Sequence, residues 1–237
     1  MSRIFEEKLA VLGISLTEQQ KQQFDKFYEL LVEWNKVMNL TGITEYEEVN
    51  EKHFVDSLSI VNAIDINQVN SVIDIGTGAG FPGIPLKIAF PHLKIVLLDS
   101  LNKRINFLNT VIVQLGLNEI KTIHGRAEDY AKQNDYREKF DLCVSRAVAN
   151  LSTLSEYCIP YVKEKGMFVP YKSGEIDVEL DHSTNAIRIL GGEIEKVVKF
   201  QLPGTEIGRS FVLIKKKQNT AKKYPRKAGL PAKEPLS

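Results

Sequence analysis

The chain has 237 residues, 43% hydrophobic and 26% charged, enough to bury one good-sized core with an appendage. No apolar run approaches the roughly 20 residues of a membrane span, and the N-terminus lacks the apolar core of a signal peptide. The two cysteines, Cys143 and Cys158, belong to no CxxC or Cys/His cluster. We therefore expect a cytoplasmic protein with no metal and no membrane segment. We also expect a monomer, although composition does not determine the oligomeric state.

Residues 1–66 have the pattern of a helical cap. A short apolar helix is predicted to end near Gly13, and Thr17 with Gln20 forms a capping-box pattern at the start of the next helix. Aromatic and aliphatic residues then recur at helical spacing as far as Met38. A third predicted helix carries His53 on its apolar face.

From Ser71 onward, strands and helices alternate. This order predicts an α/β fold with a seven-stranded, mostly parallel sheet over residues 67–217. Seven strands so arranged resemble the Rossmann-like class I methyltransferase fold. The last two strands have no clear helix between them, which predicts a terminal hairpin and one antiparallel strand. The expected strands lie near 71–75, 94–99, 119–124, 140–145, 165–171, 195–202 and 210–216.

A glycine-rich loop follows the first predicted strand. Gly76, Gly78 and Gly80 occupy alternate positions, and Asp99 ends the second strand. Glycines let a loop approach a ligand closely, and a carboxylate at the next strand's tip binds ribose hydroxyls. The pattern therefore predicts a nucleoside site, although a tight turn with no ligand is the plainer alternative.

The surroundings of the loop favour one cofactor over another. Gly78, Gly80 and Gly83 match the dinucleotide fingerprint, but prolines flank Gly83 where a helix should pack on the sheet. Asp74, inside the end of the first strand, would repel a pyrophosphate, whereas it is suited to order the loop amides and to reach a cationic ligand. These features favour S-adenosylmethionine over NAD.

The later strands supply further candidates at the same edge of the sheet. Ala127 and Glu128 follow the third strand, where a backbone amide and a carboxylate can recognise adenine; a helix N-terminal acid is the alternative for Glu128. Arg146 and Lys172 end the fourth and fifth strands, and two cations there predict a clamp for a phosphate or carbonyl. Exposed strand-end cations are the alternative.

Two features that the sequence lacks narrow the choice of the atom that would accept a methyl group. An Asn/Asp-Pro-Pro-aromatic turn, typical of exocyclic amine methylation, does not follow the fourth strand, and Cys143 lies in an apolar run rather than in a pocket. Guanine N7 needs no general base, because its methylation removes no proton. His53 and His124 receive little weight as bases, since a lone histidine on an apolar face is more often structural.

Charge is unevenly distributed along the chain. Residues 215–237 carry a net +7 and residues 1–214 a net −6. We expect residues 218–237 to form a basic flexible tail, a mobile arm that neutralises phosphates, with a solubilising role as the alternative.

Several stretches together resemble the RsmG family, bacterial small-subunit ribosomal RNA methyltransferases once called glucose-inhibited division protein B. The resemblance covers essentially the whole chain. The stretches that resemble the family are Trp34-Asn-Lys-Val-Met-Asn-Leu-Thr41, His53-Phe-Val-Asp-Ser57, Asp74-Ile-Gly-Thr-Gly-Ala-Gly-Phe-Pro-Gly-Ile-Pro85, Leu98-Asp-Ser-Leu-Asn-Lys-Arg104, Ser145-Arg-Ala147 and Lys222-Lys-Tyr-Pro-Arg-Lys227.

The resemblance implies methyl transfer from S-adenosylmethionine to N7 of guanine 527 in the 530 loop of 16S rRNA, in free RNA or in the 30S subunit. By motif, it implies cofactor contacts at Gly76, Phe81, Ala127, Glu128 and Arg146, with Asp99 at the ribose. Lys103 and Arg104 are similar to residues expected near RNA, and the same role is predicted for Lys222, Lys223, Arg226 and Lys227.

One position departs from the family pattern: the fifth strand ends Pro170-Tyr-Lys-Ser-Gly174, so whether Tyr171 stacks on a base stays open. Three other functions also stay open. They are a small-molecule methyltransferase, an NAD-dependent oxidoreductase and a non-catalytic RNA-binding or cell-division factor.

Overall fold

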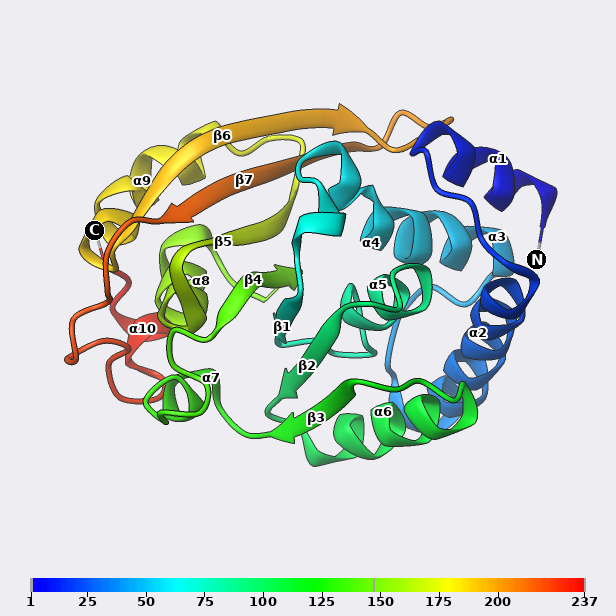
Figure 1. Ribbon diagram of the computed structural model, residues 1–237, viewed down its shortest axis with the longest axis horizontal. Helices are drawn as coiled ribbons and strands as arrows, with labels where there is room; N and C mark the ends of the chain where they lie inside the picture. Colours follow the sequence, from blue (N-terminus) through cyan, green and yellow to red (C-terminus); the bar gives the residue numbers. More distant parts are fainter. Residues whose placement is uncertain (1, 147, 237) are drawn as a thin grey trace.

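The computed structural model describes residues 2–146 and 148–236. A seven-stranded sheet crosses its centre in the order β3-β2-β1-β4-β5-β7-β6 (Figure 1). The strands are β1 (Ser71–Ile75), β2 (Lys94–Asp99), β3 (Ile120–His124), β4 (Phe140–Arg146), β5 (Val162–Ser173), β6 (Gly192–Gln201) and β7 (Gly208–Lys216).

Strands β1 to β5 pair in parallel, and β7 runs antiparallel to both β5 and β6. The predicted Rossmann-like sheet with a terminal hairpin is confirmed. Only six residues, 202–207, join β6 to β7, which is too short for a parallel crossover. The strand order reverses direction between β1 and β4, so the carboxyl ends of these strands form the edge where ligands of such sheets bind.

Helices cover both faces of the sheet. Along β1, Val72 joins the core under α5 and α6, while Ile73 joins the core under α8, as alternation along a strand requires. The helices after β1 are α5 (Gly83–Ala89), α6 (Asn102–Gln114), α7 (Ala127–Tyr130), α8 (Leu151–Cys158), the 3-10 turn η4 (Ile159–Tyr161), α9 (Asp177–Ile189) and α10 (Leu230–Lys233).

The N-terminal residues form the expected helical cap, and its capping box is present. Thr17 Oγ1 accepts a hydrogen bond from the Gln20 amide, and the Thr17 amide donates to Gln20 Oε1. The elements are α1 (Arg3–Val11), α2 (Glu18–Met38), α3 (Tyr46–Val49), a π-helical stretch η1 (Asn50–Val55), α4 (Asp56–Leu58), and the 3-10 turns η2 (Ser59–Asn62) and η3 (Ile66–Gln68).

The cap and the sheet share one hydrophobic core. The ring of Phe27 in α2 lies 5.3 Å from that of Phe81 in the glycine-rich loop, and both rings pack near Phe54. Gln20 Nε2 donates to the carbonyl of Ile88 at 2.8 Å, which ties α2 to α5. The cap is thus a layer on the sheet that reaches the ligand-binding edge.

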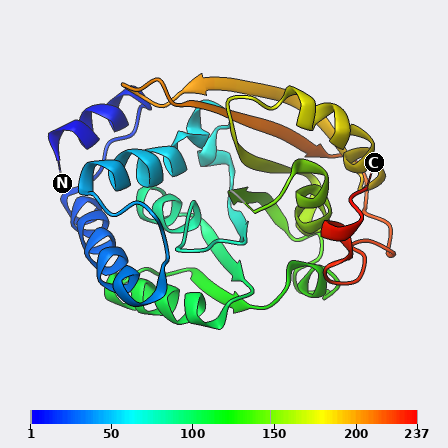
Figure 2. The same cartoon turned by 180° about the vertical axis from the view of Figure 1, so that it is seen from behind.

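The prediction that residues 218–237 form a mobile arm is wrong. After β7 the chain folds back over α7 and α8, and α10 lies beside them in both views (Figure 1; Figure 2). Tyr224 and Pro231 are buried there, and Arg226 forms an ion pair with the buried Glu156. Counting charges along the sequence missed this packing because the acidic partner lies 70 residues away.

Candidate active site

The glycine-rich loop lies between the carboxyl end of β1 and α5. Gly76, Gly78 and Gly80 have φ values of +69°, +61° and +92°, in the left-handed region that favours glycine. A Cβ at Gly76 would lie 2.6 Å from Val148, and one at Gly80 would lie 2.5 Å from Ile84. A Cβ at Gly78 would meet no described atom closer than 4.0 Å, so the loop has free space there for a ligand.

Asp99, at the tip of β2, holds this loop in place. Its Oδ2 accepts from the Gly78 amide at 2.9 Å and from Arg104 Nη1 at 3.2 Å, and its Oδ1 accepts from the Leu101 amide at 2.9 Å. A carboxylate has about four acceptor positions, so Oδ1 keeps capacity for one further donor such as a ribose hydroxyl. Arg104, predicted to lie near RNA, is thus half-buried and bonded to Asp99, whereas Lys103 is exposed.

Asp74 is fully buried, and its contacts differ from the expectation. Its Oδ2 accepts from Thr77 Oγ1 at 2.7 Å and from the Gly83 amide at 2.9 Å, so it fastens the start of α5, while Asp99 holds the loop amide of Gly78. Its Oδ1 is buried without a hydrogen-bond partner among the described residues. Burial raises the pKa of Asp74 to about 7.

The predicted adenine positions lie at the start of α7. Tyr161 donates its hydroxyl to the carbonyl of Ala127 at 2.6 Å. Glu128 is buried, and its Oε1 accepts from the amide of Gly229 at 2.8 Å. Its carboxylate therefore faces the C-terminal residues and is more than a solvated helix N-terminal acid.

Arg146, at the end of β4 and predicted to form a cationic clamp with Lys172, is bonded to a carboxylate in the structure. Its Nη1 donates to Asp56 Oδ2 at 2.9 Å and to the carbonyl of Lys52 at 3.1 Å. Asp56 is buried, and its Oδ1 accepts a hydrogen bond from a second arginine, Arg209, whose Nε lies at 2.7 Å. The guanidinium of Arg146 also lies 5.0 Å from the centre of the Phe81 ring.

The second predicted cation, Lys172, is likewise paired. Its Nζ donates to Glu179 Oε1 at 2.6 Å and to the carbonyl of Ala149 at 2.8 Å. The neighbouring Tyr171 is buried and donates its hydroxyl to the carbonyl of Ser57 at 2.7 Å. Tyr171 also lines the cavity that Arg146 and Lys172 share.

Arg146 and Lys172 nevertheless share a cavity of about 430 Å³ between the cap and the ends of β4 and β5. The cavity has a cationic lining with one buried carboxylate. Its lining residues include Lys52, His53, Asp56, Arg146, Lys172 and Arg209. Lys52, His53, Asp56 and Arg209 were not predicted as site residues. The His53-Phe-Val-Asp-Ser57 motif carried a signal for His53 and Asp56, but no motif marked Arg209.

His53 lies between this cavity and the glycine-rich loop. Its Nε2 lies 2.8 Å from Thr41 Oγ1, and its Nδ1 lies 3.2 Å from Arg146 Nη2. Burial and the charge of Arg146 lower the pKa of His53 to about 4, so the imidazole is neutral at neutral pH. A group with that pKa is a weak general base.

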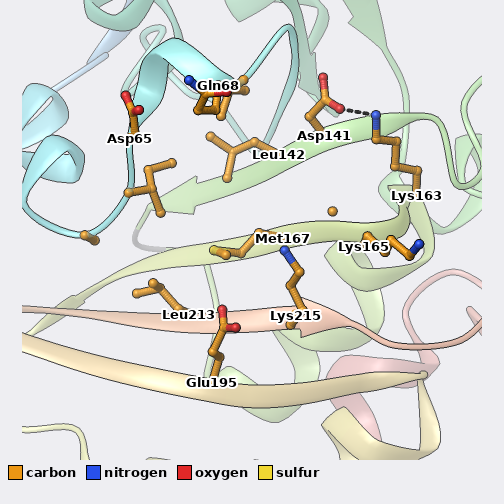
Figure 3. A pocket seen from close by; sticks show the side chains of 14 residues that line it. Asp65, Gln68, Asp141, Leu142, Lys163, Lys165, Met167, Glu195, Leu213 and Lys215 are labelled. Carbon is orange, nitrogen blue, oxygen red and sulfur yellow. Dashed lines mark ion pairs between the residues drawn. The ribbon is translucent and has the colours of Figure 1, made fainter.

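A second cavity, of about 380 Å³, lies at the opposite edge, where β4 and β5 begin (Figure 3). Leu142, Met167 and Leu213 are among its apolar lining residues, and Asp141 forms an ion pair with Lys163 at its rim. Among the described residues that line it, none is a predicted site residue.

The predicted RNA-contacting residues fall into two groups. Lys222, Lys223 and Lys227 are exposed. Arg226 instead packs against Glu156, with Nε and Nη2 donating to its carboxylate at 3.0 and 2.7 Å. Ala147, part of the Ser-Arg-Ala motif, lies outside the described residues.

Within residues 2–146 and 148–236, no group of three or more His, Cys, Asp or Glu side chains is arranged to hold a metal ion. In the same residues, every helix is too short or too polar to cross a bilayer.

Comparison with known proteins places these features in a family. The family model described as rRNA small subunit methyltransferase G matches residues 20–208. A protein named ribosomal RNA small subunit methyltransferase G from Lachnoclostridium phytofermentans is 54% identical over 232 residues, covering 98% of this chain and 96% of the relative. A protein of the same name from Brevibacillus brevis is 55% identical, covering 98% of each chain.

A solved structure supports the fold alone. It is a putative methyltransferase from Haloferax volcanii in complex with the Trm112 activator, with a TM-score of 0.57 and 12% identity, covering 79% of this chain and 98% of that one. The match to the family model and the identity along nearly the full length carry the assignment. The chain belongs to the rRNA small subunit methyltransferase G family.

Proposed function

We propose that the protein transfers a methyl group to N7 of a guanine, the one numbered 527 in the 530 loop of bacterial 16S rRNA. The names of its relatives support a ribosomal RNA substrate. The observation that carries the choice of acceptor is the cationic cavity beside the glycine-rich loop, which contains arginine and lysine donors and a neutral imidazole.

S-adenosylmethionine is the cofactor, and when bound it supplies an electrophilic methyl group that guanine N7 accepts without losing a proton. The residues present fit it. Gly78 leaves free space along the loop, Asp99 Oδ1 has room for a ribose hydroxyl, and Asp74 Oδ1 is an unsatisfied acceptor for a ligand donor. Ala127 and Glu128 are assigned to the adenine.

In the cavity, Arg146 and Lys172 are assigned to the target nucleotide. Guanine presents N7 and O6 as acceptors, and Arg or Lys side chains are their usual partners. With N7 as the nucleophile, a donor to O6 or to the adjacent phosphate holds the base while leaving N7 free. Asp56 and Glu179 keep both cations in fixed positions before the RNA arrives. Preorganised donors of this kind reduce the cost of ordering at the moment of binding.

The exposed lysines Lys103, Lys222, Lys223 and Lys227 are assigned to the RNA backbone. The substrate is 16S rRNA, free or within the 30S subunit, and the protein works as a cytoplasmic monomer.

The test is transfer of labelled methyl groups by the purified protein to 16S rRNA, to 30S subunits and to guanosine, with the modified base mapped by cleavage at N7-methylguanine. We expect one labelled guanine in the rRNA and negligible transfer to guanosine. Equal transfer to guanosine would identify a small-molecule methyltransferase, and RNA binding without transfer would identify a non-catalytic factor.

Arg146→Lys tests the cavity more sharply than Arg146→Ala, because a lysine retains the charge beside Asp56 but loses the planar fork. Because Arg146 is also a predicted cofactor contact, transfer is measured at saturating S-adenosylmethionine, and we expect at least about a tenfold loss. Arg188→Ala, on the exposed face of α9, is the control. Wild-type transfer by Arg146→Lys would show that the guanidinium does not position the target.

A further inference from the structure

The C-terminal segment, residues Thr220–Leu236, is anchored along its whole length. Arg137 donates to the carbonyls of Thr220 at 2.6 Å and Tyr224 at 2.9 Å. Further on, Thr153 in α8 donates its hydroxyl to the carbonyl of Pro231 at 3.1 Å. These bonds join the segment to α8 and to the loop before β4.

The strongest anchor is the contact between Arg226 and Glu156. The Arg226 amide, Nε and Nη2 all donate to the Glu156 carboxylate, at 2.7 to 3.0 Å, and Glu156 is completely buried. A buried carboxylate with charge-assisted bonds on both oxygens fixes its partner's position. Arg226 therefore sets where the next residues of the segment lie.

Three residues later, the segment reaches the proposed adenine position. The Gly229 amide donates to Glu128 Oε1 at 2.8 Å, and Glu128 is only 3% exposed. Gly229 has φ +84°, which turns the chain into α10. No described residue donates a hydrogen bond to the other oxygen, Oε2.

We propose that the C-terminal segment is a latch that orients Glu128 for the adenine ring of the cofactor, with Gly229 as the positioning residue. The inference rests on the proposed function, which assigns adenine to Glu128. With Oε1 held by Gly229, Oε2 is left to accept the adenine 6-amino group. A glutamate without this bond has several rotamers to lose when the cofactor binds.

The latch makes a prediction about base recognition that general packing does not. A carboxylate oxygen accepts from the 6-amino group of adenine but repels the 6-oxo group of hypoxanthine. The protein should therefore bind S-adenosylhomocysteine more tightly than S-inosylhomocysteine, and this preference should depend on the segment.

The main variant is the chain ended at Lys227, which removes Gly229 but keeps Arg226 and the basic residues before it. Dissociation constants of both probes are measured by titration calorimetry. We expect S-adenosylhomocysteine to bind about tenfold more weakly and S-inosylhomocysteine to change less than twofold. Lys233→Ala, which leaves the Gly229 bond in place, is the control and should behave as the full chain.

A second variant covers the case in which the shortened chain does not fold. Gly229→Ala has free space for its Cβ but is strained at φ +84°, so it displaces the amide while keeping the segment. We expect it to lower the preference about threefold. An unchanged preference, or equal weakening of both probes, in whichever variant folds would overturn the latch.

Glu128→Gln distinguishes a failure of the latch from a failure of the adenine assignment on which the latch rests. Its side-chain oxygen can still accept from Gly229, but its amide nitrogen would face the adenine amino group, so the preference should fall. If Glu128→Gln leaves the preference intact, the adenine assignment fails. If it lowers the preference and the segment variants do not, only the latch fails.

Discussion

The imidazole of His53 stacks on the ring of Phe81, with the ring centres 4.6 Å apart and the planes 24° from parallel. One residue belongs to the helical cap and the other to the glycine-rich loop. Arg146 contacts both, at 3.2 Å from His53 Nδ1 and over the face of Phe81. The wall between the glycine-rich loop and the cationic cavity is thus a single packed unit, so a change in the cap reaches the loop directly.

His53 should destabilise the protein in acid. Its pKa is lowered from 6.5 to about 4 in the folded protein, mainly by burial, so its contribution to stability is complete above pH 6.5 and is lost as the pH falls toward 4. The loss amounts to about 3 kcal/mol. Urea unfolding of His53→Gln between pH 4 and 7 should lack this decrease. The same acid loss in wild type and variant would show that His53 is not its source.

Asp74 should change the stability of the protein with pH in the opposite direction to His53. Burial raises its pKa from 3.8 to about 7, so the folded state holds a proton that the unfolded state has lost. Stability from this group is full below pH 3.8 and falls by about 4 kcal/mol as the pH rises through 7.

Asp74→Asn keeps an oxygen for Thr77 and Gly83 but cannot ionise, so its free energy of unfolding at pH 8 should exceed that of wild type. The comparison requires measurements at pH 5 and pH 8. A variant that is less stable than wild type at both pH values contradicts the prediction.

The contact between Arg226 and Glu156 should stabilise the fold. Arg226→Ala leaves a completely buried carboxylate without its charged partner, with the backbone amide at 226 still donating to it, which typically costs about 3–5 kcal/mol. Removing both charges, with Glu156→Gln added, should recover much of that loss. Lys227→Ala, one exposed residue further along, should change the free energy of unfolding by less than about 0.5 kcal/mol. If Arg226→Ala costs no more than Lys227→Ala, the pair is not a structural anchor.

The salt dependence of RNA binding should distinguish the exposed lysines of the C-terminal segment from Arg226, which is bonded to Glu156. Each lysine that neutralises a phosphate adds about 0.7–0.9 to the slope of log binding constant against log salt. Replacing Lys222, Lys223 and Lys227 together by Gln should lower the magnitude of the slope by about 2. Arg226→Gln should leave it nearly unchanged, because Arg226 already faces Glu156. A slope that the triple variant does not move would confine these lysines to a solubilising role.

Much of the site could be predicted from local pattern. The alternation of strands and helices, the three glycines and the acids at 74 and 99 are features of short stretches of sequence, so pattern and spacing alone predict a nucleoside site. The contact that Asp99 makes with Gly78 spans 21 residues and is visible only in the structure. The same reasoning placed Arg146 and Lys172 together at one edge of the sheet but did not predict their carboxylate partners, because Asp56 and Glu179 come from other elements. It treated Arg226 as part of a mobile arm for the same reason.

The sequence by itself determined the fold class and the family, because hydrophobic periodicity and glycine placement are local properties that the backbone must obey. Tertiary structure decided which charges are available to a ligand. A cation's function depends on which carboxylate lies within hydrogen-bond distance, and at Arg146, Lys172 and Arg226 folding brought that carboxylate from 90, 7 and 70 residues away.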